Sequence, residues 1–146
     1  MEKDELLRLY NSLKQIDFFA DLTVHELDLL IAVLKTEKAE AGKTIVKQGK
    51  KGDCLYLISR GSVSVIINEG LFKKIKTAEL KDGDYFGEMA LLGDQKRKAS
   101  VVARTECEMI VLHRKDFWDI IMKNPAIEEK VNSTSKNRTL ANEGKN

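Results

Sequence analysis

The hydrophobic positions at the start of the chain recur about every 3.6 residues, which is the period of an amphipathic helix. They are Leu6, Leu7, Tyr10, Leu13 and Ile16. We therefore predict that the chain opens with a helix that turns this apolar stripe toward a core.

A second helix is predicted from Val24 to about Leu34. Thr23 and Glu26 have the spacing of a capping box. In such a box the Thr23 hydroxyl accepts a hydrogen bond from the Glu26 amide, and the Glu26 carboxylate accepts one from the Thr23 amide. The residues expected to face the core are Leu27, Leu30, Ile31 and Leu34.

Between Thr36 and His113 the pattern changes to short apolar runs separated by turns that are rich in glycine. In one run apolar and polar positions alternate, so Val63, Val65 and Ile67 should share one face of a strand. The spacers are too short for the crossover helices of a parallel sheet, which leaves a β-sandwich, jelly roll or barrel. The predicted strands are Thr36–Glu40, Thr44–Val46, Cys54–Ser59, Ser62–Asn68, Phe72–Leu80, Ala99–Ala103 and Cys107–His113.

The last third returns to a helical period. Lys115–Met122 is amphipathic, and a further short helix should begin at Pro125, a favoured first-turn residue, and carry Ile127 and Val131 inward. The polar residues 132–146 are expected to form a disordered tail.

The length of 146 residues suits one domain. We place this domain at residues 1–131, with helices over 1–34, a β-roll over 35–113 and C-terminal helices over 114–131.

Composition narrows the class of protein. Twenty-five basic and twenty-three acidic residues give a net charge of +2, which argues against a dedicated nucleic-acid-binding surface. Cys54 and Cys107 are too few for a disulfide framework, and no clustered cysteines or histidines suggest zinc. The chain shows no signal peptide and no apolar run of about 18 residues, so we expect no membrane span and a cytoplasmic location.

One segment between two predicted strands is longer than a tight turn requires. A short helical run from Glu88 to Leu92 follows Gly87 there. The free N–H groups and dipole at a helix start favour an anion, and a glycine allows close approach. Arg97 offers a planar fork suited to phosphate oxygens. The Glu88 carboxylate would repel a phosphate. We therefore expect it to accept a hydrogen bond from a hydroxyl of the sugar next to that phosphate, as in a nucleotide.

This segment resembles the phosphate-binding cassette of the cyclic nucleotide-binding domain family. The family pattern is Phe-Gly-Glu-x-Ala-Leu, a short loop, and Arg followed one residue later by Ala and a Ser or Thr. The resemblance extends from roughly Phe18 to Val131. The matching cassette residues are Phe86, Gly87, Glu88, Met89, Ala90, Leu91, Arg97, Ala99 and Ser100.

The resemblance implies a mainly β fold with flanking helices, namely an eight-stranded antiparallel jelly-roll β-barrel. It also implies a cAMP or cGMP ligand and no cofactor. No metal is expected, because the residues show no metal-ligand constellation. Val65 and Ile67 match positions that line the purine pocket.

Roles within the cassette follow from the same resemblance. Glu88 would bind the ribose 2′-hydroxyl, and the backbone of Gly87 and Ala90 would bind phosphate and sugar oxygens. Arg97 would pair with the cyclic phosphate. The residues expected around phosphate and ribose are Phe86, Gly87, Glu88, Met89, Ala90, Arg97, Lys98 and Ala99.

The sequence departs from the family pattern on both sides of the arginine. Lys96 stands where proline is frequent, and Lys98 stands where Ala, Ser or Thr is usual. A hydroxyl at the second position helps accept guanine in the family, so the choice between cAMP and cGMP stays open. Lys98 could add a phosphate contact, point to solvent, or mark a pocket that has changed its ligand.

No arrangement of catalytic residues emerges, so we predict a protein that is not an enzyme. His25 and His113 have no second histidine or acidic partner placed for catalysis or metal binding, and both are expected to be structural. The resulting hypothesis is a cyclic nucleotide sensor that signals through its C-terminal helices to a separate effector protein. Two alternatives are a jelly-roll scaffold without ligand and a fragment of a DNA-binding regulator, although Lys96 to Lys98 lack the interleaved aromatics of a nucleic-acid site.

Overall fold

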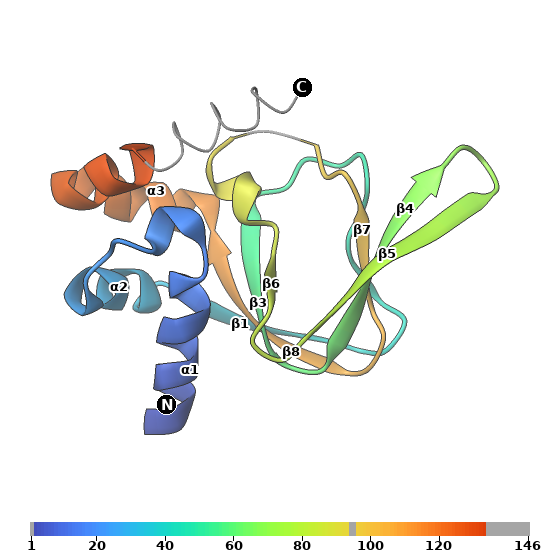
Figure 1. Ribbon diagram of the computed structural model, residues 1–146, viewed down its shortest axis with the longest axis horizontal. Helices are drawn as coiled ribbons and strands as arrows, with labels where there is room; N and C mark the ends of the chain where they lie inside the picture. The colour runs from blue at the N-terminus through green and yellow to red at the C-terminus, as the bar shows by residue number, and fades with distance from the viewer. Residues whose placement is uncertain (1, 94–95, 134–146) are drawn as a thin grey trace. The chain divides into compact units, whose positions relative to one another are not determined.

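The computed structural model describes residues 2–93 and 96–133. The chain divides into two compact units, one comprising Met1–Val33 with Asp116–Asn146 and the other Leu34–Lys115. The first unit is helical and the second contains all the strands of the described residues (Figure 1).

The helical unit contains three aromatic rings that pack edge-on or tilted. Phe18 and Phe19 have ring centroids 4.8 Å apart, and Phe117 lies 6.4 Å and 5.8 Å from them. All three rings are fully buried. The elements of this unit are α1 (Lys3–Lys14), the 3₁₀ turn η1 (Asp17–Phe19), α2 (Val24–Ile31), most of α3 (Arg114–Lys123) and a helix over residues 125–133.

The buried face of α1 differs from the predicted stripe. Leu7 is 50% exposed, whereas Leu9, which the predicted stripe does not include, is buried together with Leu13. Leu9 and Leu13 are four residues apart and therefore lie on the same helix face, which excludes Leu7. The expectation for Leu7 was wrong because a run of neighbouring leucines fits more than one helical phase.

The capping box at the start of α2 is confirmed. The Glu26 amide donates to Thr23 Oγ1 at 3.1 Å, and the Thr23 amide donates to Glu26 Oε1 at 2.9 Å. Glu26 Oε1 also accepts from Lys130 Nζ at 2.6 Å, which ties the last helix to α2. Ile127 and Val131 are fully buried, as predicted. Helix α2 ends at Ile31, earlier than expected.

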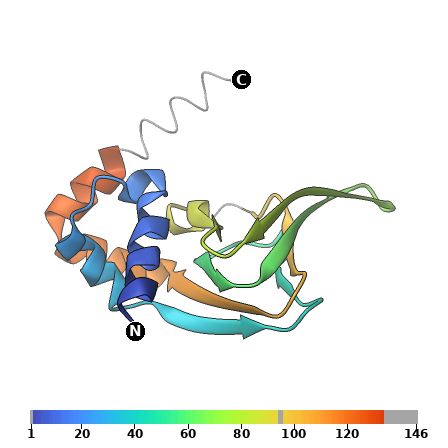
Figure 2. The same cartoon turned by 60° about the horizontal axis from the view of Figure 1, so that its bottom comes forward.

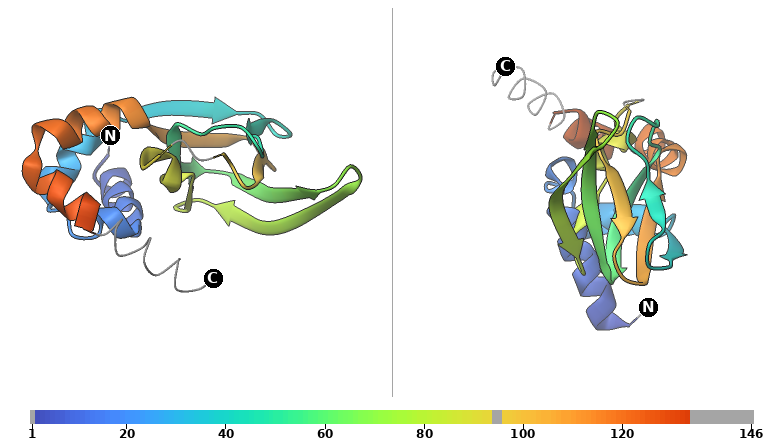
Figure 3. Two further views of the ribbon diagram at one scale, coloured as in Figure 1. Left: turned by 90° about the horizontal axis from the view of Figure 1, so that it is seen from above. Right: turned by 90° about the vertical axis from the view of Figure 1, so that its right-hand side faces the viewer.

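The strands form two four-stranded antiparallel sheets, ordered β1-β8-β3-β6 and β2-β7-β4-β5. They lie as separate layers, as the left view of Figure 3 shows. This arrangement agrees with the jelly roll that the family resemblance implied. The strand bounds are Lys35–Ala39 (β1), Thr44–Val46 (β2), Cys54–Arg60 (β3), Ser62–Glu69 (β4), Lys73–Lys81 (β5), Tyr85–Phe86 (β6), Ser100–Ala103 (β7) and Cys107–His113 (β8).

The core of this unit lies between the sheets because alternate residues of each strand point inward. Val63 is fully buried, and Val65 packs against the buried cluster from the same face of β4. The β4–β5 hairpin extends past the other strands (Figure 2). The buried cluster consists of Ala39, Cys54, Tyr56, Ile58, Val63, Phe86, Val101, Ala103, Cys107, Met109 and Val111.

Strands β2 and β8 have the predicted bounds, but β6 was not predicted. Residues 132 and 133 continue the last helix instead of beginning a tail. The rest of the predicted disordered tail, residues 134–146, lies outside the described residues. Among the helices of the described residues, none has the length and apolarity needed to cross a membrane.

Candidate functional site

The backbone of Arg97 is fixed by the loop before β3. The Arg97 amide donates to the carbonyl of Lys50 at 2.8 Å, and the Gly49 amide donates to the carbonyl of Arg97 at 2.8 Å. Arg97, which is 43 positions after Cys54 in the sequence, is thereby held next to Cys54 at the start of β3.

The guanidinium of Arg97 occupies a space that two glycines leave open. A Cβ atom at Gly52 would lie 2.1 Å from Arg97 Nε, and one at Gly87 would lie 2.4 Å from Nη1. Nη2 donates to the carbonyl of Cys54 at 2.9 Å. Nε is buried and has no hydrogen-bond partner among the described residues. Burying an N–H donor of a cationic group without a hydrogen-bond partner costs free energy, and a bound anion that accepts from it removes that cost.

The cassette itself is a single 3₁₀ turn. Gly87 has a left-handed backbone, with φ of 82°, and turns the chain from β6 into η2 (Glu88–Leu91). The predicted helix from Glu88 to Leu92 is therefore shorter and tighter than expected. The amide of Ala90 donates to the carbonyl of Gly87 at 3.1 Å, so that N–H is already used inside the turn. The Arg97 side chain lies against Gly87, so the two ends of the cassette motif are close together in space.

The remaining cassette residues differ in exposure. Phe86 is buried and stacks on Tyr56, with ring centroids 4.9 Å apart and planes 9° apart. Its side chain therefore belongs to the core and supports the turn that follows. Glu88, Met89 and Ala99 are half-buried, whereas Lys98 is exposed.

The two predicted purine-pocket residues lie on β4, which belongs to the sheet that does not contain β3 and β6. Val65 pairs with Val101 of β7, and Ile67 pairs with Ile75 of β5. Both side chains are half-buried.

Arg114 is a residue near the cassette that the sequence analysis missed. Its Nη1 donates to the carbonyl of Gly93 at 2.9 Å, and its amide donates to the carbonyl of Asp53 at 2.7 Å. Arg114 is also the first residue of α3. It therefore links the end of the cassette turn, the start of β3 and the helix that leaves the β unit. An arginine at a strand-to-helix junction was the only sequence signal for it.

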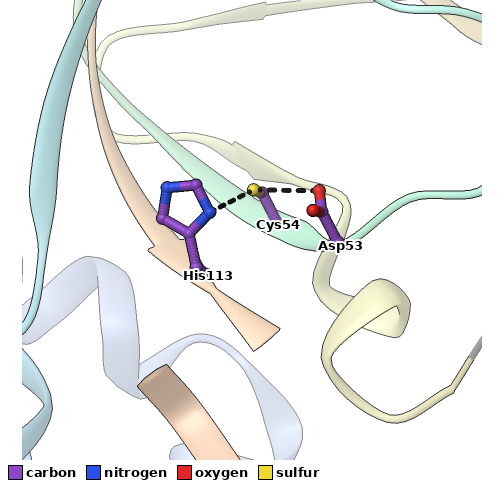
Figure 4. A group of neighbouring side chains, drawn as sticks. All are labelled: Asp53, Cys54 and His113. Atoms are coloured by element: carbon purple, nitrogen blue, oxygen red, sulfur yellow. Dashed lines mark hydrogen bonds between the residues drawn. The ribbon is translucent and has the colours of Figure 1, made fainter. Parts of the chain in front are cut away.

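His113 also has neighbours that the sequence analysis did not foresee. Its Nδ1 lies 3.2 Å from the sulfur of Cys54, which lies 3.2 Å from Oδ1 of Asp53 (Figure 4). Burial, followed by the hydrogen bond to Asp53, raises the pKa of Cys54 to about 12. The expectation that no acidic partner lies near His113 was wrong, because antiparallel pairing of β3 with β8 places Cys54 opposite His113 and brings the neighbouring Asp53 within 4.8 Å of it.

Comparison with known families identifies the architecture. The family described as cyclic nucleotide-binding domain matches residues 36–124, which is more than half of the chain. The chain belongs to the cyclic nucleotide-binding domain family. The matched range contains both sheets except Lys35 of β1, and it contains the cassette, Arg97 and Arg114.

Curated relatives of this cyclic nucleotide-binding domain include cGMP-dependent protein kinases and regulatory subunits of cAMP-dependent protein kinase. A cGMP-dependent protein kinase egl-4 from Caenorhabditis briggsae is 34% identical over 116 residues, covering 78% of this chain and 16% of the relative. A cAMP-dependent protein kinase regulatory subunit from Emericella nidulans is 38% identical over 111 residues, covering 75% of this chain and 26% of the relative. The chain thus spans about a quarter or less of the length of these relatives.

Solved structures of similar domains agree with the fold. The regulatory domain of Toxoplasma gondii PKA with cAMP has a TM-score of 0.67 at 27% identity, covering 87% of this chain and 48% of that one. The regulatory subunit of a cAMP-independent protein kinase A from Trypanosoma brucei has a TM-score of 0.68 at 26% identity, covering 94% and 49%. Similar domains therefore include one described with cAMP and one described as cAMP-independent.

Proposed function

We propose that this cyclic nucleotide-binding domain binds cAMP or cGMP reversibly at the cassette and catalyses no reaction. The observation that carries the proposal is Arg97, whose guanidinium fills the space that Gly52 and Gly87 leave and whose buried Nε lacks a partner among the described residues. A cyclic phosphate supplies the acceptor that this guanidinium needs.

The remaining residues of the site follow the family pattern. Half-buried Glu88 accepts the ribose 2′-hydroxyl, and the backbone around Gly87 and Ala90 receives phosphate and sugar oxygens. Because the Ala90 amide already donates within η2, the ligand must compete with that bond. Val65 and Ile67 contact the purine from β4.

The identity of the base stays open between adenine and guanine. The relatives include a cGMP-dependent kinase and a cAMP-dependent kinase subunit. Lys98 is exposed and lacks the hydroxyl that helps accept guanine in the family. Both nucleotides therefore belong in the first experiment.

The output is proposed to pass through α3 to a separate effector protein, for which the relatives favour a protein kinase. Arg114 supports this route because it joins the Gly93 carbonyl to the first turn of α3. A ligand that moves the cassette turn changes this contact, and it shifts the helix population by its difference in affinity for the two states. We propose no membrane or nucleic-acid partner, and a cytoplasmic location that suits two free cysteines.

A second candidate is a jelly-roll scaffold that binds no cyclic nucleotide. Two observations favour it: Lys96 and Lys98 are exposed departures from the family pattern, and one structural neighbour is described as cAMP-independent.

Calorimetric titration of cAMP and cGMP into the full chain, stripped of carried-over nucleotide, decides between the two. Arg97→Ala should lower the affinity at least tenfold, because a charge-assisted hydrogen bond contributes about 1.5–3 kcal/mol. Arg60→Ala is the matched control, since Arg60 is an exposed arginine at the end of β3. Absence of heat and of a thermal shift with both nucleotides in the unmodified chain would favour the scaffold.

A further inference from the structure

Three side chains outside the proposed nucleotide contacts meet at the start of β3. The sulfur of Cys54 lies 3.2 Å from both His113 Nδ1 and Asp53 Oδ1. One possible ligand atom from each of the three residues lies within 4.8 Å of the other two. Figure 4 shows the side chains turned toward one another, with the sulfur between the imidazole and the carboxylate.

Strand pairing fixes this arrangement. Cys54 at the start of β3 is the register partner of His113 at the end of β8. The carbonyl of Asp53 accepts the amide of Arg114, the residue that follows His113. The backbones that carry the three side chains are therefore held by hydrogen bonds between the two chain segments, which is the support that a preformed site requires.

Exposure within the cluster is graded. Cys54 is buried, His113 is half-buried and Asp53 is exposed. An ion from solvent can therefore meet the carboxylate first and then the imidazole and the sulfur. A path of this kind is one of the features a metal site needs.

We propose that Asp53, Cys54 and His113 form a binding site for a divalent transition-metal ion, with Zn²⁺ as the preferred occupant. Thiolate, imidazole and carboxylate are the side-chain ligands that Zn²⁺ takes in proteins. Around a tetrahedral zinc the sulfur and nitrogen ligands lie about 3.6 Å apart. The observed 3.2 Å therefore has to open by about 0.4 Å, which small side-chain rotations supply.

The charges of the cluster match a divalent cation. Binding breaks the S–H bond of Cys54, releases the proton to solvent and forms a metal–sulfur bond. The thiolate and the Asp53 carboxylate then neutralise the two positive charges, while His113 binds as a neutral imidazole. Ca²⁺ and Mg²⁺ are poor occupants because they require oxygen ligands, and only Asp53 supplies a side-chain oxygen here.

A catalytic cysteine is the other use of a cysteine beside a histidine, and the geometry disfavours it. In a nucleophilic triad the carboxylate orients the imidazole, whereas Asp53 contacts the sulfur of Cys54. Cys54 is also only 4% exposed, so its sulfur is poorly placed to attack a substrate. A metal ligand, in contrast, is compatible with a buried sulfur.

The composition of the chain supplies matched controls. The sequence contains two cysteines and two histidines, so Cys107 and His25 are the only other residues of each type. Cys107 is buried like Cys54, and its sulfur contacts the carbonyls of Ser62 and Thr105. His25 is exposed in the first turn of α2.

The first test uses the unmodified full chain without nucleotide, so its result does not depend on the cassette. Titration with Co²⁺ should produce a thiolate-to-cobalt charge-transfer band that saturates at one equivalent. Zn²⁺ should displace the cobalt and raise the thermal midpoint, and EDTA should reverse both effects. A chain that gives no thiolate band with Co²⁺ overturns the proposal whatever the variants do.

The second test compares variants by competition for Zn²⁺ with a chromophoric chelator. Cys54→Ser and His113→Gln should lose the cobalt band and bind Zn²⁺ about 100-fold or more weakly, because changes even outside the ligand shell cost 10–100-fold. Cys107→Ser and His25→Gln should keep the band and the affinity of the unmodified chain. Retention of the band in Cys54→Ser, or its loss in Cys107→Ser alone, overturns the assignment.

Discussion

Arg97 and Gly52 lie so close together that the Arg97 side chain can take its observed position only because Gly52 has no side chain. A Cβ atom at Gly52 would lie 2.1 Å from Nε and 2.3 Å from Cζ of Arg97. The atoms in the way belong to a side chain, which can move, and not to the backbone. An alanine at Gly52 would therefore displace the guanidinium and leave the backbone of the loop before β3 in place.

Gly52→Ala should lower the affinity for a cyclic nucleotide at least tenfold while changing the free energy of unfolding by less than about 1 kcal/mol. Calorimetric titration and urea denaturation measure the two quantities. Gly93→Ala is the matched control, because Gly93 also flanks the site but a Cβ atom added there would meet no other atom within 4 Å. Equal affinities of the two alanine variants would show that the position of Arg97 does not matter for binding.

Arg114→Met tests the route from the cassette to α3. The substitution removes the hydrogen bond to the Gly93 carbonyl but keeps an apolar stem of similar reach. Trp118, the only tryptophan of the chain, lies on α3 beside Phe117 and reports on that helix. The nucleotide-induced change in Trp118 fluorescence should be lost, while the affinity falls by no more than about tenfold.

Lys115→Met is the control for this variant, because Lys115 is the next residue of α3 and is exposed. A full fluorescence response in Arg114→Met would mean that the signal leaves the cassette by another route.

The Glu26–Lys130 pair should make the helical unit sensitive to acid. The hydrogen bond from Lys130, followed by that from the Thr23 backbone, lowers the pKa of Glu26 below its ordinary value of 4.5. A lowered pKa means that the pair stabilises the fold above about pH 4.5, and that this contribution is lost as the pH falls through the folded-state pKa. Replacing Glu26 by Gln should therefore cost stability near neutral pH and progressively less in acid.

Urea unfolding monitored by Trp118 fluorescence between neutral pH and pH 3.5 measures this difference for Glu26→Gln (the lower limit lies about one unit below an ordinary glutamate pKa). Glu69→Gln is the control, because Glu69 and Lys73 form an exposed pair at 3.8 Å and such pairs contribute little. A pH-independent difference for Glu26→Gln would contradict the assignment.

Two neighbouring residues of β3 should limit stability in alkali. Burial raises the pKa of Cys54 from 9.0 to about 12 and that of Tyr56 from 10.0 to about 12. Both groups keep their protons longer when folded, so stability is full below about pH 9 and falls as the pH rises toward 12. Each group contributes a slope of up to about 1.4 kcal/mol per pH unit over its own interval.

Tyr56→Phe should reduce that slope above pH 10, since it removes a titrating group and keeps the ring that stacks on Phe86. Urea denaturation followed by far-ultraviolet circular dichroism at several alkaline pH values measures the slope. An unchanged slope in Tyr56→Phe would show that the Tyr56 hydroxyl does not limit stability there.

Local sequence pattern predicted the elements that have a repeating period or a distinctive cap. The Thr23–Glu26 box and the alternation at Val63 and Val65 are examples, because each depends on residues a few positions apart. Strand β6 contains only Tyr85 and Phe86, and a segment of two residues has no period to detect.

The local sequence pattern could not predict contacts between segments that are far apart in the sequence. The cassette motif indicated Glu88 and Arg97 as site residues, but it did not show that Gly52 leaves the space for the guanidinium. The meeting of Cys54 and His113 depends on the register of β3 with β8. A slip of one residue would turn every side chain of a strand to the opposite face, and apolar pattern alone does not choose the partner strand.

Strand β5 is the edge strand of its sheet, and its composition opposes pairing with a further strand. An edge strand offers unpaired backbone groups to any other extended chain, and lysines along it oppose such pairing by charge and hydration. Four exposed lysines serve this purpose on β5, at positions 73, 74, 76 and 81. The β4–β5 hairpin can therefore extend into solvent without becoming a template for aggregation.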